Sequence, residues 1–172
     1  SSPNATDCLL LEMQPIMSLR SPRESLNFEV LLRMREPDGR VVPAGAVISA
    51  AEKSGRASVI DRWVLNTTLA WIAEHAEQLG NTRFVCMNLS GASLNDERFV
   101  QDTFEILGRY VHVASRLCLE ITESVALHDL DNTRRFIDQV RSFGVKVALD
   151  DFGAGYTSFS YLKELPADVL KI

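Results

Sequence analysis

Long apolar runs, close cysteine pairs and an excess of positive charge are all missing from this 172-residue chain. No apolar stretch approaches the roughly 20 residues that a helix needs to span a bilayer. Residues 1–7 also lack the basic and apolar regions of a signal peptide. We therefore expect a soluble domain in the cytoplasm without direct membrane contact, either free or as the cytoplasmic part of a membrane-anchored protein.

Cysteine content and net charge exclude further classes of site. Cys8, Cys86 and Cys118 are odd in number and widely spaced, and two of them lie in apolar strand-like runs. This indicates buried free thiols in a reducing compartment, and no close Cys/His pairing suggests zinc. The formal charge of −5 argues against a nucleic-acid polymer as partner, since such proteins usually carry a basic stripe. A small phosphate ligand held through metal ions is compatible with that charge.

The remaining composition is that of an ordinary globular protein, with 46% hydrophobic and 24% charged residues and no repeat or linker. We predict one domain over residues 1–172. Apolar periodicity predicts strands at 8–16, 28–34, 83–89, 116–121, 145–150 and 169–172, and helices at 44–53, 58–79, 96–110, 130–143 and 158–163. A polar loop joins the first two strands and favours an antiparallel start. The later alternation favours parallel pairing through right-handed crossovers.

Counting in twos along four of these strands separates a polar face from an apolar one. The polar faces carry Glu29 and Arg33, then Asn88, Glu120 and Asp150 in the successive strands. Apolar faces directed at covering helices, with polar faces directed at a common interior, favour a barrel, whose active site lies at the carboxyl ends of the strands. Such oxygen ligands select Mg²⁺ or Mn²⁺. Arg33 taken alone is more typical of a surface ion pair.

The predicted strand 145–150 runs directly into two adjacent carboxylates, Asp150 and Asp151, followed by Phe152 and Gly153. Neighbouring negative charges repel unless a cation lies beside them, so the pair predicts a divalent metal ion. Asp-Phe-Gly also occurs in protein kinases, where the aspartate binds magnesium. This chain lacks the glycine-rich nucleotide loop and the His-Arg-Asp loop that would precede it there.

Each acidic or amide side chain also has a purely structural alternative. Asp150 could cap the following turn, and Asn88 could satisfy a loop backbone. Glu120 could pair with Arg116 or Lys146. The joint pattern favours a metal, because several carboxylate and amide groups on one interior face would be costly to bury without a cation.

Several short motifs resemble those of the EAL domains, a family that hydrolyses the bacterial second messenger cyclic di-GMP. The signature Glu-Ala-Leu-x-Arg appears as Glu29-Val30-Leu31-Leu32-Arg33, with valine in place of alanine on the apolar face. Further matches follow in family order across nearly the whole chain: Gln14-Pro15-Ile16, Asn88-Leu89-Ser90, Glu120-Ile121-Thr122-Glu123, Asp150-Asp151-Phe152-Gly153-Ala154-Gly155-Tyr156 and Leu170-Lys171-Ile172. Together these motifs are highly specific.

The resemblance implies a modified TIM-type (β/α)8 barrel with an antiparallel first strand, which uses two Mg²⁺ or Mn²⁺ ions to open cyclic di-GMP to linear pGpG. It assigns the metal ligands by motif to Glu29, Asn88, Glu120, Asp150 and Asp151. Glu29, Asp151 and Lys171 would be catalytic, with Lys171 orienting or helping to deprotonate the attacking water. The ligand contacts would be Gln14, Leu31, Arg33 and Asp61, with Arg33 on a phosphate and Asp61 accepting from guanine. Glu123 would stabilise the loop after Asp151.

The same resemblance implies a homodimer fused to sensory or GGDEF domains in the full protein. Because complete barrels of this class need about 250 residues, residues 1–172 would form the N-terminal two-thirds of an EAL domain. We expect an incomplete barrel of about six strands, inactive as a fragment. Some relatives keep contacts of the Arg33 type yet bind cyclic di-GMP without cutting it, so a non-catalytic receptor is the alternative, and the retained acids favour catalysis.

Overall fold

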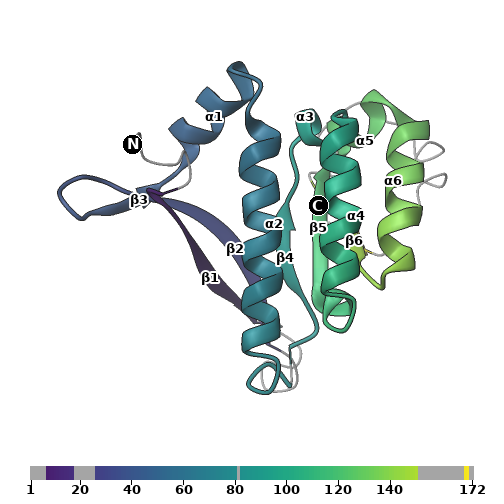
Figure 1. The fold of residues 1–172 in the computed structure, drawn as a ribbon, viewed down its shortest axis with the longest axis horizontal. Coiled ribbons are helices and arrows are strands. Elements are labelled where there is room, and N and C mark those ends of the chain that lie inside the picture. The colour runs from purple at the N-terminus through teal and green to yellow at the C-terminus, as the bar shows by residue number, and fades with distance from the viewer. Residues whose placement is uncertain (1–6, 18–25, 81, 151–168, 171–172) are drawn as a thin grey trace.

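Seven strands join into one sheet in the part of the chain that the computed structural model describes, residues 7–17, 26–80, 82–150 and 169–170 (Figure 1). The strands are β1 (Leu9–Met17), β2 (Leu26–Arg35), β3 (Val41–Pro43), β4 (Val85–Asn88), β5 (Leu117–Thr122), β6 (Lys146–Asp150) and β7 (Val169–Leu170). The helices are α1 (Gly45–Lys53), α2 (Ala57–Glu74), α3 (Gly91–Leu94), α4 (Glu97–Arg109), α5 (Glu123–His128) and α6 (Leu130–Ser142), with a 3-10 turn at Ala114–Arg116.

The sheet has the order β1-β2-β4-β5-β6-β7, with β3 paired to β2 off this path. β1 runs antiparallel to β2, while β2, β4, β5, β6 and β7 are parallel neighbours. This confirms the predicted antiparallel start and the parallel continuation. The sheet is open, as expected for an incomplete barrel of about six strands.

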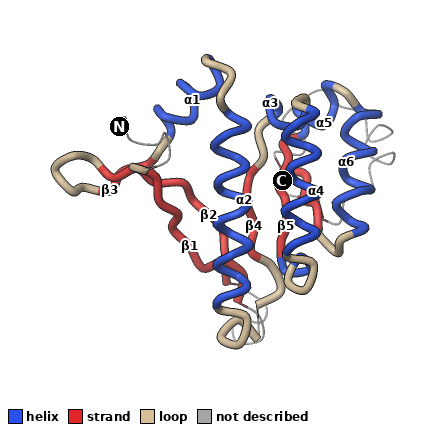
Figure 2. The backbone as a smooth tube through the Cα atoms, in the orientation of Figure 1, coloured by secondary structure: helices blue, strands red, loops and turns tan. Residues whose placement is uncertain are grey.

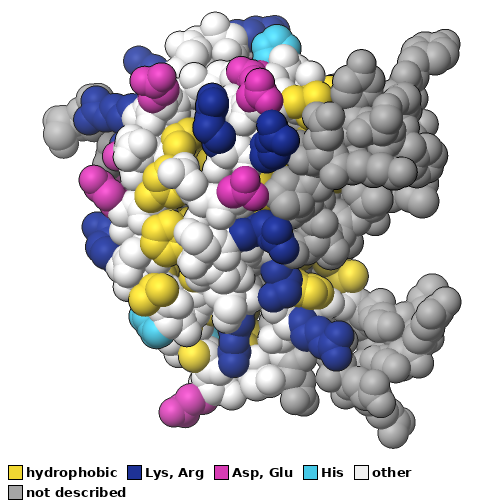
Figure 3. All heavy atoms as spheres, turned by 90° about the vertical axis from the view of Figure 1, so that its right-hand side faces the viewer, with side chains coloured by type: hydrophobic (Ala, Val, Ile, Leu, Met, Phe, Trp, Pro, Cys, Tyr) yellow, Lys and Arg dark blue, Asp and Glu magenta, His cyan; other side chains and the backbone are white. Residues whose placement is uncertain are grey.

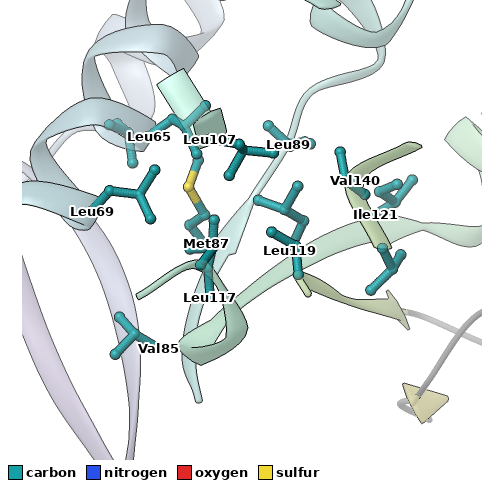
Figure 4. Close-up of a cluster of buried hydrophobic side chains, with 14 of the residues drawn as sticks. Leu65, Leu69, Val85, Met87, Leu89, Leu107, Leu117, Leu119, Ile121 and Val140 are labelled. Atoms are coloured by element: carbon teal, nitrogen blue, oxygen red, sulfur yellow. The ribbon is translucent and has the colours of Figure 1, made fainter. Parts of the chain in front are cut away.

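Helices α2, α4 and α6 lie side by side and cover one face of the sheet (Figure 1). Figure 4 shows the contact between these layers, where Leu65 and Leu69 of α2 and Leu107 of α4 meet Met87 of β4 and Leu119 of β5. All five side chains have no exposed surface. Burial of these apolar side chains fixes which face of each strand meets the helices, and leaves the other face for the barrel interior.

Charged side chains lie outside this core. On the side that carries α6, Figure 3 shows basic and acidic side chains spread over the outer surface, with basic ones along the boundary of the residues drawn in grey. In α6 itself Phe136, Ile137 and Val140 are buried while Asp131 and Arg134 are exposed. The helix therefore has one apolar stripe, which is the pattern that predicted it.

Two short helices follow directly after strands, at the same end of the molecule as α1 (Figure 2). Ser90 caps α3 by accepting from the Ser93 N–H (3.2 Å), and Thr122 caps α5 by accepting from the Val125 N–H (3.3 Å). With four and six residues, α3 and α5 are too short to show a helical period, so the sequence did not predict them.

The predicted helix over 58–79 is too long. α2 ends at Glu74, and turns occupy residues 75–80. Leu79 is only 5% exposed and belongs to the hydrophobic core. Its side chain is apolar because this connecting turn packs against the core, and not because the helix continues. β3 was not predicted either, because three residues give too little alternation. The predicted helix 158–163 lies outside the described residues. No helix among the described residues is both long enough and apolar enough to cross a membrane.

Candidate functional site

The strand register tests the predicted polar face directly, because cross-strand partners point to the same side of a sheet. Glu29 pairs with Cys86, and two residues further on Asn88 pairs with Glu120. Gln14 of β1 is the partner of Glu29 on the other side. These side chains share one face, opposite the face that packs under the helices. The face assignment made from alternation is thus confirmed for β2, β4 and β5.

The shared polar face becomes more buried toward the middle of the sheet. Asn88 is exposed and Glu29 is half-buried, while Glu120 is 1% exposed. Two residues earlier in β4 and β5, Cys86 and Cys118 are buried free thiols, as predicted for both, whereas Cys8 is exposed. A carboxylate as buried as that of Glu120 is costly to keep ionised unless a cation or hydrogen-bond donors lie beside it.

The donor atoms at this level fit a hard divalent cation. Glu29, Asn88 and Glu120 offer two carboxylates and one amide oxygen, which Mg²⁺ and Mn²⁺ prefer. Within the described part of the chain, no three acidic, histidine or cysteine side chains gather into a metal-binding group. Asp151 and Lys171 lie outside the described residues, as do the side chains of Asp150 and Glu123, so their predicted roles stay predictions.

The backbone places Asp150, the first residue of the predicted acid pair, at the carboxyl edge of the sheet. β6 ends at Asp150, which is the register partner of Thr122 at the end of β5. β7 then pairs Leu170 with Leu149 on the far side of β6. The carboxyl ends of β4, β5 and β6 thus follow one another along the sheet, as the predicted barrel mouth requires.

The two cations considered as partners for Glu120 donate to main-chain oxygens near the amino end of β5. Arg116 Nη1 donates to the carbonyls of Ala76 (3.2 Å) and Leu79 (2.8 Å), and Lys146 Nζ donates to the carbonyl of Ser115 (3.2 Å). Both side chains therefore hydrogen-bond to connecting segments at the end of the sheet opposite the predicted site.

Arg33 forms the ion pair that its sequence context suggested, but with a partner on the polar face. Its Nε donates to Glu12 Oε2 at 3.0 Å, and the two side chains are 24% and 53% exposed. Glu12 is the register partner of Leu31. The bond uses one of the five N–H donors of the guanidinium. Glu12 was missed in the sequence, although it lies two residues before Gln14 on the same face.

A pocket of about 360 Å³ opens where β2 changes partners. Along one edge β2 pairs with β4 at Phe28 and Glu29, and then with β3 from Arg33 to Arg35. The pocket lies between these pairings. Its lining is mostly apolar and comes from β2, the end of β4, α1 and α2: Val30, Leu31, Leu32, Arg33, Pro43, Ala44, Gly45, Ile48, Ala51, Glu52, Ala57, Ile60, Asp61, Val64, Asn88, Leu89 and Ser90.

This pocket brings together four predicted site residues, Leu31, Arg33, Asp61 and Asn88, from three separate elements. The described residues that line this pocket do not include Gln14, Glu29 or Glu120. The variant residue Val30 of the signature is 5% exposed and belongs to the hydrophobic core. The valine is therefore accommodated on the helix side of β2, as its place in the alternation predicted.

Asp61 of α2 is held by the segment that follows β4. Its Oδ2 accepts from the Ser90 N–H (2.9 Å), the Ser90 hydroxyl (2.9 Å) and the Ser93 hydroxyl (2.6 Å). Burial raises the pKa of this carboxyl above its ordinary value, although the hydrogen bonds from Ser93 and Ser90 oppose that shift; nearby Glu52 adds to it. Ser93 was missed in the sequence, where only its spacing of three from Ser90 could have suggested a cap.

Comparison with known proteins agrees with this arrangement. The family model described as "EAL domain" matches residues 5–172. Among curated proteins, the cyclic di-GMP phosphodiesterase PdeB of Shewanella oneidensis is 37% identical over 170 residues, covering 95% of this chain and 19% of that protein. The cyclic di-GMP phosphodiesterase PdeF of Escherichia coli is 34% identical over 162 residues, covering 94% of this chain and 21% of that protein.

Solved structures give the same result. The FimX EAL domain of Pseudomonas aeruginosa bound to c-di-GMP has a TM-score of 0.83 and 30% identity, covering 97% of this chain and 66% of that one. The PaMucR phosphodiesterase in complex with c-di-GMP has a TM-score of 0.79 and 33% identity, covering 96% and 66%. The chain thus spans about a fifth of the curated relatives and just under two thirds of these solved domains. With a family match over nearly all its length and the sheet order and polar face described above, this chain belongs to the EAL domain family.

Proposed function

We propose that this chain is the N-terminal part of a metal-dependent phosphodiesterase domain that hydrolyses cyclic di-GMP to linear pGpG. The observation that carries the proposal is the register of β2, β4 and β5, which puts Glu29, Asn88 and Glu120 on one face beside a pocket containing Arg33. Both curated relatives compared above are named as cyclic di-GMP phosphodiesterases.

Metal ligation in this proposal falls to Glu29, Asn88, Glu120, Asp150 and Asp151. Two bound Mg²⁺ or Mn²⁺ ions would stabilise the entering and leaving oxygens and lower the pKa of water. Asn88 and Glu120 are adjacent in register, and half-buried Glu29 lies on the neighbouring strand. Glu29 and Glu120 lie within strands of the sheet, which limits their movement, while Asn88 is the last residue of β4.

The ligand would occupy the pocket that opens where β2 changes its partner from β4 to β3, here called the fork of β2. Arg33, whose Nε donates to Glu12 (3.0 Å), would face a phosphate, since a guanidinium can donate two parallel hydrogen bonds to phosphate oxygens. Leu31 and the apolar pocket wall would contact a base, and Asp61 would accept from guanine through the oxygen that does not bind the two serines. Gln14, exposed on β1, would reach the ligand from the other side of Glu29.

Hydrolysis adds water to one phosphodiester of the ring. The water oxygen bonds to phosphorus, the bond from phosphorus to the 3′ oxygen breaks, and that oxygen takes a proton. Lys171 would orient or help to deprotonate the water, with Glu29 and Asp151 completing the catalytic set, while Glu123 would stabilise the loop after Asp151. This division of roles follows the family motifs.

The test is to incubate the complete protein with cyclic di-GMP and Mg²⁺ or Mn²⁺ and to measure pGpG by chromatography. Glu29→Ala should abolish turnover while leaving appreciable ligand binding. Glu105→Gln, an exposed charge change on α4, is the matched control and should leave turnover unchanged. Binding without product in the wild type would identify a non-catalytic receptor, and absence of binding would contradict both functions.

We also propose that the complete protein acts in the cytoplasm as a homodimer and carries sensory or GGDEF domains besides this one. The short share of the relatives that this chain covers supports further domains. One relative, 34% identical over 170 residues, is the bifunctional diguanylate cyclase/cyclic di-GMP phosphodiesterase MucR of Pseudomonas aeruginosa. Residues 1–172 alone should be inactive, because the sheet of the described residues is open and the chain covers only 66% of the related solved domains.

A further inference from the structure

The segment after β4 is fixed at two successive peptide groups directly behind Asn88. The Leu89 N–H donates to the carbonyl of Glu120 (2.9 Å), which continues the parallel pairing of β4 with β5. The next N–H, that of Ser90, donates to Asp61 Oδ2 (2.9 Å). The first is a hydrogen bond between strands of the sheet, while the second connects the segment after β4 to the Asp61 carboxylate of α2.

The same carboxylate oxygen also organises the first turn of α3. The Ser93 hydroxyl donates to it at 2.6 Å, and the Ser90 hydroxyl lies 2.9 Å from both Asp61 Oδ2 and Ser93 Oγ. Ser90 Oγ in turn accepts from the Ser93 N–H (3.2 Å). Ser93 has no exposed surface, and it does not line the pocket at the fork of β2. These contacts form a compact polar cluster, here called the Asp61 clamp: Asp61, Ser90 and Ser93.

We propose that the Asp61 clamp positions the amide of Asn88 for metal binding, so that Asp61 and Ser93 are positioning residues for the metal site. The proposal rests on the proposed function. Asn88 is the most exposed of the described metal-ligand candidates and ends its strand. The Asn88 side chain keeps its orientation only if the backbone that follows it is held in place. The hydrogen bond from the Ser90 N–H to Asp61 of α2 holds that backbone from outside the sheet.

Two features distinguish this role from ordinary loop stabilisation. Bonds to an ionised carboxylate are stronger than bonds between neutral groups, so one aspartate can hold an exposed connection in a single geometry. The carboxylate also comes from α2, the helix that packs on β4, and not from the loop itself. Groups that orient metal ligands in this way typically change metal affinity by about 10- to 100-fold when they are removed.

The experiment measures Mn²⁺ binding to the complete protein by electron paramagnetic resonance of free Mn²⁺, with no substrate present. The variants are Asp61→Asn, Ser93→Ala and Asn88→Ala, together with both clamp variants in the Asn88→Ala background. Asp102→Asn is the matched control, because Asp102 ties α4 to the same helix α2 through Arg62 (2.8 Å) and is not a member of the Asp61 clamp. Thermal melts in EDTA identify any variant that has lost its fold.

We expect Asp61→Asn to weaken Mn²⁺ binding by about 10-fold or more, Ser93→Ala to weaken it less, and Asp102→Asn to leave it unchanged. In the Asn88→Ala background both clamp substitutions should lose their effect, because residues that act as one unit are not additive. Ser93→Ala should leave metal-free affinity for cyclic di-GMP unchanged, which separates positioning from a ligand contact.

Wild-type Mn²⁺ affinity in folded Asp61→Asn and Ser93→Ala would overturn the clamp's role and leave the proposed function standing. An equal loss with and without Asn88 would also overturn it. No Mn²⁺ binding by the wild type would overturn the metal site itself, and with it both proposals. If Asp61→Asn fails to fold, Ser93→Ala decides by the same criteria.

Discussion

Leu119→Ala should lower the free energy of unfolding of the complete domain by about 3 kcal/mol, while Glu120→Gln at the next position should change the metal-free protein by less than about 1 kcal/mol. The two residues are adjacent in β5 but lie on opposite faces of it. Leu119 has no exposed surface and packs among the side chains of β4 and the covering helices (Figure 4). Glu120 faces the barrel interior beside Asn88.

The magnitude for Leu119 follows from its surroundings. Deleting a buried leucine side chain costs about 2 to 5 kcal/mol, with the larger losses where neighbours do not collapse into the cavity. Leu119 lies in a central strand paired on both sides, so its backbone does not move inward. Since domains are stable by about 5 to 15 kcal/mol, this loss is a large fraction of the total. It corresponds to a fall in Tm of about 6 to 12 °C.

Urea unfolding followed by tryptophan fluorescence measures both changes, because Trp63 and Trp71 of α2 pack against the core. Val111→Ala, which removes methyl groups from a side chain that is 59% exposed, is the control and should have little effect. Adding Mn²⁺ should stabilise Leu119→Ala but not Glu120→Gln. If Glu120→Gln lost as much stability as Leu119→Ala, or if Leu119→Ala lost less than about 1 kcal/mol, the assignment of the two faces would be refuted.

Three further outcomes are expected. Because burial raises the pKa of Asp61, the folded state binds more protons than the unfolded chain just above pH 3.8. The free energy of unfolding should therefore fall as the pH rises through the folded pKa. Thermal melts at several pH values should not show this fall for Asp61→Asn. Hydrogen bonds from the Phe99 N–H, Ser58 and the Arg98 N–H lower the pKa of Asp96, the N-cap of α4. The ionised cap therefore contributes stability above pH 3.8, and this contribution is lost as the pH falls through the lowered pKa. Urea titrations of Asp96→Ala should not show this loss of stability in acid. Gly91→Ala should destabilise the protein by about 1 kcal/mol, since a Cβ there would lie 3.1 Å from Val125, and an unchanged Tm would show that α5 yields freely.

Local patterns account for most of the fold. Alternation along a strand has a period of two residues, so the sequence alone assigns Glu29, Asn88 and Glu120 to one face. The long helices were equally predictable from their apolar stripes. The overrun of α2 to Leu79 shows the limit, because a buried residue in a turn has the same composition as one in a helix.

The ion pair of Arg33 illustrates a second limit. Its sequence context predicted a surface ion pair, and the family resemblance implied a phosphate contact. The structure gives it Glu12 as a partner 21 positions away and places it in the pocket wall. The partner depends on the antiparallel register of β1 with β2, which alternation alone does not fix. The fork of β2 is likewise a tertiary feature, because it requires β3 and β4 on the same edge.

The strand–helix order, the polar and apolar faces, and the acids along the predicted barrel mouth can be predicted from the amino-acid sequence, because each depends on neighbours two to four residues apart. The role of Asp61 depends on how distant elements pack. Its partners Ser90 and Ser93 lie 29 and 32 positions away, and the α2–β4 packing that brings them within hydrogen-bonding distance has no local signature. A carboxylate expected to bind guanine is therefore first of all a clamp on the strand end that carries Asn88, since hydrogen bonds depend on distance in space and not along the chain.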